Sequence, residues 1–100
     1  MTWYVYIIEC NDGSLYTGIT NDLDKRINAH NAGYGAKYTK SRLPVHLRYS
    51  EPAKNRSQAC QREYAIKSLK KSAKIYLITT QTAENWLKFL GNFYDINSFF

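Results

Sequence analysis

Two short runs of strand-forming residues, separated by a turn, constrain the fold of this chain more than any other feature. Residues 3–8 are all aromatic or β-branched, and residues 15–19 have a similar character. The Asn-Asp-Gly sequence at 11–13 between them is typical of a tight turn. Because both faces of the first run are apolar or aromatic, the sequence predicts a β-hairpin whose first strand is central in a sheet, with a layer packed on each side.

The length of the turn decides which side chains of the hairpin share a face. With a three-residue loop and Gly13 in the left-handed conformation, Tyr6 lies opposite Gly18. A two-residue turn would shift the register by one residue and place Tyr6 and Tyr16 on opposite faces. We favour the three-residue loop. The residues that it places on one face are Tyr6, Ile8, Tyr16 and Gly18.

A helix is predicted over residues 22–31, with Thr20 or Asn21 as its N-cap. Its buried stripe is expected to consist of Leu23, Ile27 and His30. Arg26 falls on the same stripe, although arginine is almost never fully buried without a partner. Arg26 is therefore a candidate functional residue. The alternative is an arginine at the edge of the stripe, with its stem packed and its guanidinium in water.

Residues 33–40, Gly-Tyr-Gly-Ala-Lys-Tyr-Thr-Lys, are predicted to form a loop that could hold a backbone phosphate. Its two glycines let the main chain approach a ligand closely, and its lysines and tyrosines add charge and stacking surface. Together with two further positions, this loop supplies the candidate nucleic-acid-binding residues, which are Gly18, Lys37, Tyr38, Lys40 and Arg42.

A third strand is predicted over residues 45–49, and a second helix of about fourteen residues begins at Ser57 and ends near residues 70–71. The apolar side of this helix is expected to consist of Ala59, Cys60, Ile66 and Leu69. Glu63 falls within the same arc, where a carboxylate must be paired, metal-bound or neutralised. The alternative to a functional role is an ion pair with Lys67, one turn later.

The residues after this helix leave two structures open. Residues 74–80 fit either a fourth strand or a helix, and Thr82 is expected to cap a final helix over residues 83–90. The tail over residues 93–100 is rich in aromatic side chains. We expect this tail either to fold back onto the sheet or to meet another subunit.

The charge of the chain indicates a polyanionic partner. One hundred residues are enough for one domain, and the net charge of +6 is concentrated between residues 37 and 74, where eleven Lys and Arg stand against two Glu. Such a surface attracts nucleic acid first and anionic membrane second. The two cysteines form no CxxC pair, which argues against a disulfide framework and a structural zinc site. Because no apolar run is long enough to span a membrane or resembles a secretory signal, we expect a cytoplasmic protein without a membrane partner.

The motifs occur in one order along the chain: Tyr4-Val5-Tyr6, Tyr16-Thr17-Gly18, Arg26 with His30, the loop at 33–40, and Glu63. Together they resemble the GIY-YIG nuclease family, and in particular its small stand-alone members. The first motif stands where the family has Gly-Ile-Tyr, and the tyrosine that ends the motif is retained. The resemblance covers roughly residues 1–80.

The resemblance implies an α+β fold in which a small three-stranded antiparallel sheet is flanked by helices. Residues 1–80 would then form the nuclease-like domain. Residues 81–100 would form a helix and the aromatic tail, packed on the same domain or at an interface. A homodimer formed through this tail is one expected assembly.

The resemblance also implies a divalent-metal-dependent endonuclease that hydrolyses phosphodiester bonds, with DNA favoured over RNA as the partner. Glu63 would be the protein's ligand to a single Mg²⁺ or Mn²⁺, with water and phosphate oxygens as the other ligands. Arg26 would stabilise charge on the phosphate, and His30 would support the network. Tyr6 and Tyr16 would position the attacking water, and which of them takes its proton stays open. A tyrosine base needs a nearby cation, such as Arg26, because its ordinary pKa is about 10. The alternative function is a nucleic-acid-binding module with weak or no cleavage that needs a partner for targeting.

Overall fold

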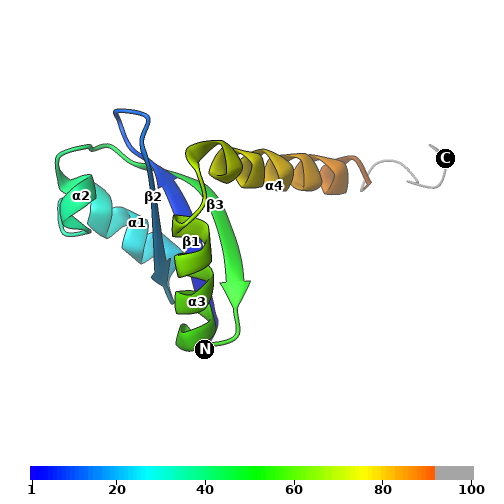
Figure 1. Cartoon of the computed structure of the whole chain (residues 1–100), viewed down its shortest axis with the longest axis horizontal. Helices are drawn as coiled ribbons and strands as arrows, with labels where there is room; N and C mark the ends of the chain where they lie inside the picture. Colours follow the sequence, from blue (N-terminus) through cyan, green and yellow to red (C-terminus); the bar gives the residue numbers. More distant parts are fainter. Residues whose placement is uncertain (92–100) are drawn as a thin grey trace.

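The computed structural model describes residues 1–91, apart from the side chains of residues 85, 86 and 88–91, and contains one three-stranded sheet (Figure 1). Its elements are β1 (Trp3–Glu9), β2 (Leu15–Thr20), α1 (Leu23–Asn31), α2 (Lys37–Lys40), β3 (His46–Ala53), α3 (Arg56–Lys67) and α4 (Lys71–Gly91). β1 is the central strand, and β2 and β3 pair with it in antiparallel orientation on either side. The α+β class and the central position of the first strand are therefore confirmed.

The β1–β2 hairpin has the register that brings both tyrosines to one face. Gly13 has a φ of 82°, in the left-handed region that the three-residue loop requires. Across the hairpin, Tyr6 pairs with Gly18 and Ile8 pairs with Tyr16. Residues that face each other across antiparallel strands point to the same side of the sheet. The predicted three-residue loop and its shared face are therefore confirmed.

Each face of the sheet carries its own small core, with α1 packed on one face and α3 on the other (Figure 1). The core on the α1 side consists of Tyr6, Ile8, Cys10 and Val45, with Leu23 and Ile27 packed against it. The core on the α3 side consists of Val5, Ile7, Tyr49, Ala59 and Ile66. Alternate residues of β1 enter the two cores, which explains why neither face of this strand is polar.

The N-cap of α1 is Asp22, and the prediction of Thr20 or Asn21 is wrong. The Asp22 carboxylate accepts a hydrogen bond from the amide of Lys25 at 3.1 Å. The Thr20 hydroxyl is bonded instead to the backbone N–H and C=O of Asp22, because Thr20 is the last residue of β2. These bonds hold the first turn of α1 against the end of β2.

The middle of the chain differs from the prediction in two places. Residues Lys37–Lys40 form a one-turn helix, α2, inside the segment that was predicted as a loop. β3 covers His46–Ala53, which extends well past the predicted residues 45–49. The strand is longer because β1 offers pairing partners along its whole length, up to Trp3, which pairs with Ala53.

α3 is shorter and less buried than the predicted helix. It covers Arg56–Lys67, which is twelve residues. Ala59 and Ile66 are completely buried, whereas Cys60 is exposed and Leu69, beyond the end of the helix, is 38% exposed. The predicted core positions of Cys60 and Leu69 are therefore wrong. The physical reason is that α3 rests on the sheet along a narrow stripe, which only part of its apolar arc reaches.

The described C-terminal part is a single helix, α4, which includes residues 74–80 and continues past Thr82. Thr82 does not cap a helix, because its hydroxyl donates to the Ile78 carbonyl one turn earlier at 3.0 Å. The Gln81 side chain accepts a hydrogen bond from the Ser50 N–H at 3.3 Å and donates one to the Ser50 C=O at 2.6 Å. These two bonds occupy two of the backbone groups that β3 would offer to a further strand.

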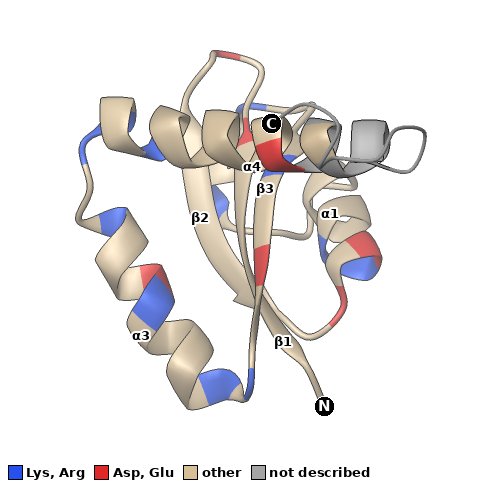
Figure 2. Ribbon diagram, turned by 90° about the vertical axis from the view of Figure 1, so that its right-hand side faces the viewer, with Lys and Arg blue, Asp and Glu red and all other residues tan. Residues whose placement is uncertain are grey.

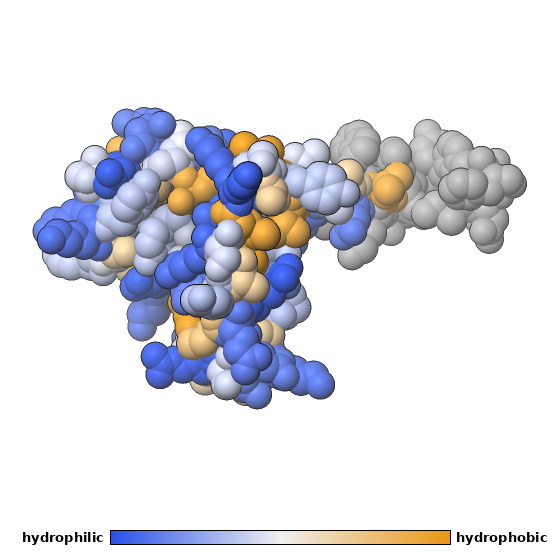
Figure 3. Space-filling model, in the orientation of Figure 1, coloured by the Kyte–Doolittle hydropathy of each residue, from blue (hydrophilic) through white to orange (hydrophobic). Residues whose placement is uncertain are grey.

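α4 continues beyond the sheet, and the expected domain division at residue 80 falls within it (Figure 1). Hydrophobic surface gathers around the junction of α3 and α4 (Figure 3), where Leu69 and Ile75 are partly exposed. The tail over residues 93–100, and with it the expected homodimer, lies outside the described residues. Within residues 1–91, no helix is both long and apolar enough to cross a membrane.

Candidate active site

The Tyr6 ring lies over Gly18 of β2, in the space that a side chain would fill. A Cβ at position 18 would lie 2.5 Å from the phenol oxygen. The ring is completely buried, and its hydroxyl lies 2.9 Å from His30 Nε2 and 3.3 Å from Arg26 Nε. The role that the structure shows for Gly18 is therefore to make room for Tyr6. A backbone contact between Gly18 and nucleic acid stays a prediction.

His30 is the buried centre of the site. Its ring meets both tyrosines edge-on, with centroid distances of 5.9 Å to Tyr6 and 5.6 Å to Tyr16. Its Nδ1 lies 2.8 Å from Thr39 Oγ1 of α2. Gly35 packs against it so closely that a Cβ would lie 2.6 Å from His30 Cγ and 2.8 Å from His30 Cα. The sequence marks Thr39 and Gly35 only as members of the 33–40 loop, and their contacts with His30 could not be predicted because they arise from folding.

Burial determines the protonation of Tyr6 and His30. It raises the pKa of Tyr6 above its ordinary value, although the nearby Arg26 guanidinium acts in the opposite direction. Burial, and secondarily the charge of Arg26, lowers the pKa of His30 below its ordinary value. At neutral pH, Tyr6 therefore keeps its proton and His30 is free to accept one. The cation that a tyrosine base was expected to need is present, but desolvation of the phenol outweighs it.

Tyr16 is half-buried in a stack of aromatic and cationic side chains. Its ring stacks on Tyr38 with a centroid distance of 6.1 Å, and the Lys67 ammonium lies 6.0 Å from its centroid. The Arg42 guanidinium lies 4.0 Å from the Tyr38 centroid and forms an ion pair with Asp12 at 3.0 Å. Tyr38 and Arg42 are thus engaged within the protein, and their contact with nucleic acid stays a prediction. No hydrogen bond joins the Tyr16 hydroxyl to another residue of the described chain, so this hydroxyl is available to a ligand.

The guanidinium of Arg26 points at the Tyr6 hydroxyl, so Arg26 does more than pack its stem at the edge of the stripe. Its side chain is half-buried, and its Nε donates to the Tyr6 hydroxyl. Within residues 1–91, its two terminal nitrogens make neither a hydrogen bond nor a salt bridge. They remain available for an anion, and a guanidinium suits phosphate oxygens in particular.

The charge of Glu63 acts on Tyr6, although Glu63 comes from the helix on the other face of the sheet. Its negative charge contributes to the raised pKa of Tyr6. Its carboxylate lies 3.8 Å from the ammonium of Lys67, which in turn lies over the Tyr16 ring. The ion pair expected as the alternative is therefore present, but such a pair contributes only a few tenths of a kcal/mol. The Glu63 side chain is 24% exposed, so its carboxylate remains within reach of solvent and ligands.

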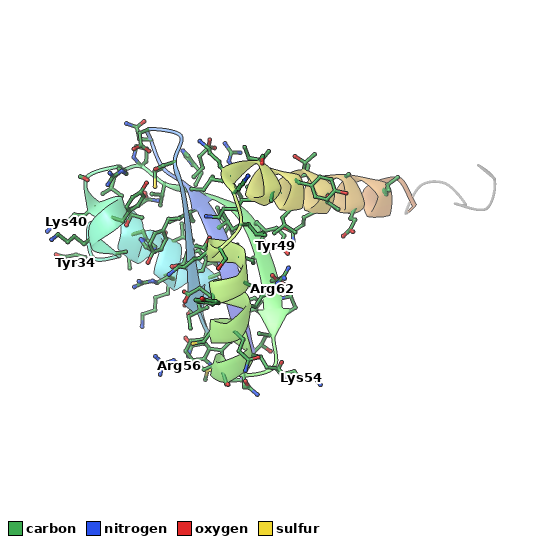
Figure 4. All side chains as sticks on the ribbon, viewed as in Figure 1. Tyr34, Lys40, Tyr49, Lys54, Arg56 and Arg62 are labelled. Atoms are coloured by element: carbon green, nitrogen blue, oxygen red, sulfur yellow. The ribbon has the colours of Figure 1, made fainter. Side chains whose placement is uncertain are left out.

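A second ion pair, next to Glu63 in the chain, fixes the position of α3. Arg62 reaches from α3 toward β3 (Figure 4), where its Nε donates to the Glu51 carboxylate at 2.6 Å. The hydrogen bond to Glu51, and secondarily the Glu51 charge, raises the pKa of Arg62 above its ordinary value. This contact ties the turn of α3 that carries Glu63 to the edge of the sheet.

The described residues suit a cation that takes most of its ligands from water and substrate and few from the protein. No group of three or more His, Cys, Asp or Glu side chains converges anywhere in residues 1–91. Mg²⁺ is commonly held by one or two carboxylates, with several waters and substrate phosphates as its remaining ligands. Glu63 fits this mode because it is an oxygen donor, partly open to solvent and not locked in a close ion pair.

Positive charge lies on both helices that contact Tyr16. On α2, Lys37 and Lys40 are exposed, and neither forms a salt bridge with a described residue. Figure 4 shows Lys40 and Tyr34 at the outer margin of the molecule, and the Tyr34 residue is 83% exposed. Figure 2 shows further Lys and Arg residues distributed along α3. Both helices that contact Tyr16 thus carry cations, and one of these, Lys67, lies over its ring.

Comparison with known proteins shows the family to which this chain belongs. The model of the GIY-YIG catalytic domain family matches residues 2–77. A UPF0213 protein of Clostridium perfringens is 53% identical over 87 residues, which cover 85% of this chain and 94% of that protein. A UPF0213 protein of Staphylococcus aureus is 52% identical over 75 residues, which cover 75% of this chain and 92% of that protein.

Two solution NMR structures are also similar. The UPF0213 protein BH0048 from Bacillus halodurans is 44% identical, with a TM-score of 0.52 over 80% of this chain and 85% of that one. The protein EF2693 from E. faecalis is 38% identical, with a TM-score of 0.55 over 82% of this chain and 88% of that one. Because the family model spans the whole sheet and the helices that surround the tyrosines, and the relatives match over most of their own lengths, this chain belongs to the GIY-YIG family of nucleases, alongside the small UPF0213 proteins.

Proposed function

We propose that this protein is a divalent-metal-dependent endonuclease that hydrolyses phosphodiester bonds in DNA. The observation that carries the proposal is the position of the Tyr6 hydroxyl, which lies between the guanidinium of Arg26 and the imidazole of His30. A neutral phenol bonded to a neutral imidazole is equipped to pass on a proton, and the guanidinium beside it is equipped to bind a phosphate. The family match and the net charge of +6 support a polyanionic substrate.

Arg26 binds the scissile phosphate in this proposal. Before substrate binds, its Nε donates to the Tyr6 hydroxyl. Its terminal nitrogens donate to the non-bridging phosphate oxygens, on which charge develops in the transition state. Tyr16, with its available hydroxyl, orients the attacking water. Glu63 would hold one Mg²⁺ or Mn²⁺, and a metal bound there would neutralise negative charge on the phosphate.

Tyr6 and His30 together take the proton of the attacking water. As the water oxygen bonds to phosphorus, its proton passes to the Tyr6 oxygen, and the Tyr6 proton passes to His30 Nε2. The bond from phosphorus to the leaving sugar oxygen breaks, and that oxygen takes a proton from solvent. His30 returns its extra proton to solvent after the product leaves. Because the Tyr6 hydroxyl is buried without substrate, this step requires the half-exposed Arg26 side chain to shift toward the phosphate.

The rate of cleavage is expected to fall on the acidic side of neutrality, with a midpoint below pH 6.5. His30 must be neutral to accept a proton, and burial together with Arg26 holds its pKa below the ordinary value of 6.5. The contribution of His30 to the free energy of unfolding changes with pH in the same direction, because the unfolded chain binds this proton more readily. This contribution is fully present above pH 6.5 and is lost as the pH falls through the lowered pKa of His30. Cleavage rates measured between about pH 5 and 9 at fixed ionic strength locate the acidic midpoint. An acidic limb centred above pH 6.5 would contradict it.

Replacing Tyr6 by phenylalanine tests the proposed function directly, and we expect the single-turnover rate of DNA cleavage to fall about 100-fold. The ring that lies over Gly18 is kept, but the hydroxyl that joins Arg26 to His30 is lost. Supercoiled plasmid, single-stranded DNA and RNA are incubated with Mg²⁺ or Mn²⁺, and EDTA is added to parallel samples.

The matched control is Tyr76→Phe, which makes the same chemical change on a 71% exposed residue of α4 and is expected to cut at the wild-type rate. Equal cutting by the wild type and Tyr6→Phe would assign the activity to a contaminant. Cleavage that survives EDTA would contradict the metal requirement, and preferential cleavage of RNA would contradict DNA as the substrate.

A further inference from the structure

The hydrogen-bond chain that starts at Tyr6 ends on α2. From the Tyr6 hydroxyl it runs 2.9 Å to His30 Nε2, and from His30 Nδ1 it runs 2.8 Å to Thr39 Oγ1. Thr39 Oγ1 then lies 3.0 Å from the carbonyl oxygen of Ala36. Tyr6, His30 and Thr39 are all completely buried, so each polar atom of the chain depends on its neighbour for a hydrogen bond.

The direction of this chain is decided at Tyr6. Apart from His30 Nε2, the Tyr6 hydroxyl has one hydrogen-bond partner among the described residues, Arg26 Nε, which can only donate. If His30 Nε2 carried a proton, the buried Tyr6 O–H would have no acceptor, which is costly. Tyr6 therefore donates to His30 Nε2, and this nitrogen is unprotonated.

The Thr39 end of the chain agrees with this direction. A neutral imidazole with a bare Nε2 carries its proton on Nδ1, so Nδ1–H donates to Thr39 Oγ1. The Thr39 hydroxyl then donates a hydrogen bond to the Ala36 carbonyl oxygen, which can only accept. That carbonyl also receives the backbone N–H groups of Thr39 and Lys40, each at 3.2 Å, and the hydroxyl at 3.0 Å is the closest of the three donors. Every donor in the chain then meets an acceptor.

We propose that Thr39 is a positioning residue for hydrolysis: by accepting from Nδ1–H it adds to the effect of Tyr6 in holding His30 in the tautomer protonated on Nδ1, which presents Nε2 to Tyr6 as the proton acceptor. This inference rests on the function proposed above. Thr39 acts again after the transfer, because the Nδ1–H of the positively charged imidazole keeps its acceptor. A base that is oriented by a third group is a recurring arrangement in nucleophilic catalysis.

The tautomer can be measured without reference to activity. Long-range ¹H–¹⁵N correlation of the imidazole rings in the full-length protein, at a pH well above 6.5, reports which nitrogen carries the proton; the variant His46→Gln identifies the signals of His30. We expect Nδ1–H in the wild type. In Thr39→Val the ratio of Nδ1–H to Nε2–H is expected to fall about tenfold, and Thr39→Ser is expected to restore it. A wild-type ring protonated on Nε2, or an unchanged ratio in Thr39→Val, overturns the proposal.

The kinetic arm asks whether the tautomer matters for cleavage. Thr39→Val is expected to lower kcat about tenfold with little change in KM for DNA, and Thr39→Ser is expected to stay within about twofold of the wild type. Thr79→Val, at an exposed position of α4, is the matched control and is expected to be unchanged. An active enzyme whose kcat is unaffected by Thr39→Val overturns the positioning role. A wild type with the expected tautomer that cleaves no nucleic acid overturns the proposed function and leaves the tautomer assignment supported.

Discussion

Replacement of Glu63 by glutamine is expected to lower Mg²⁺-dependent DNA cleavage by about three orders of magnitude, because the loss of roughly 4 kcal/mol of charge stabilisation at the phosphate corresponds to that factor. The variant keeps the shape of the side chain and removes the carboxylate that pairs with Lys67. The fold should be preserved, since the lost pair with Lys67 contributes only a few tenths of a kcal/mol. Plasmid nicking and single-turnover rates measure the effect.

Binding must be measured separately from cleavage in this experiment. Anisotropy of a labelled duplex, with Ca²⁺ in place of Mg²⁺, should show that Glu63→Gln binds DNA as tightly as the wild type or more tightly, because one negative charge is lost. Glu84→Gln, at an exposed position of α4, is the matched control and should cut normally. Wild-type cleavage by Glu63→Gln would remove Glu63 from the site. Loss of binding together with cleavage would show that Glu63 has a different role from metal binding.

Substituting Gly35 by alanine is expected to destabilise the fold by about 3 kcal/mol, because it overpacks the closest contact of His30. The new methyl group would lie 2.6 Å from His30 Cγ and 2.8 Å from His30 Cα. The second of these atoms belongs to the backbone of α1, so it cannot move without shifting the helix that also carries Arg26. For a domain of this size the midpoint of thermal unfolding should fall by about 12–24 °C. Circular dichroism during heating or in urea measures both quantities.

Gly33 provides the comparison for this prediction. It has a φ of 86°, and a Cβ there would meet nothing within 4 Å. Gly33→Ala therefore costs only the strain of a left-handed backbone, about 1–2 kcal/mol. If Gly33→Ala destabilises the protein more than Gly35→Ala, the close packing of Gly35 on His30 is not a determinant of stability.

The elements that depend on local sequence could be predicted, and those that depend on packing could not. The Asn-Asp-Gly turn sets the register of the hairpin within a few residues, which is why the shared face of Tyr6 and Tyr16 is confirmed. Periodicity also places α1 and α3 correctly to within a few residues. It could not show that α3 touches the sheet along a narrow stripe, and so Cys60 was assigned to a core that it does not enter.

The C-terminal helix shows the same limit. Residues 74–80 contain both β-branched and helix-forming side chains, so their periodicity left strand and helix open. The structure has a helix there, anchored by the two hydrogen bonds between Gln81 and the backbone of Ser50. These residues are far apart in the chain, and their contact cannot be inferred from a local pattern. The predicted cap at Thr82 failed because a threonine hydroxyl can also bond to the carbonyl one turn earlier within a continuous helix.

The sequence by itself determined the order of the motifs, the face shared by the two tyrosines and the excess of positive charge, because these depend on residue type and on short spacings. Only the tertiary structure decided that Tyr6 passes over Gly18, that Thr39 and Gly35 enclose His30, and that Tyr38 and Arg42 are engaged within the protein. It also decided that the pKa of Tyr6 rises despite the cation beside it. The physical reason is that desolvation and close contact depend on which surfaces folding brings together, and residues far apart in the chain supply those surfaces.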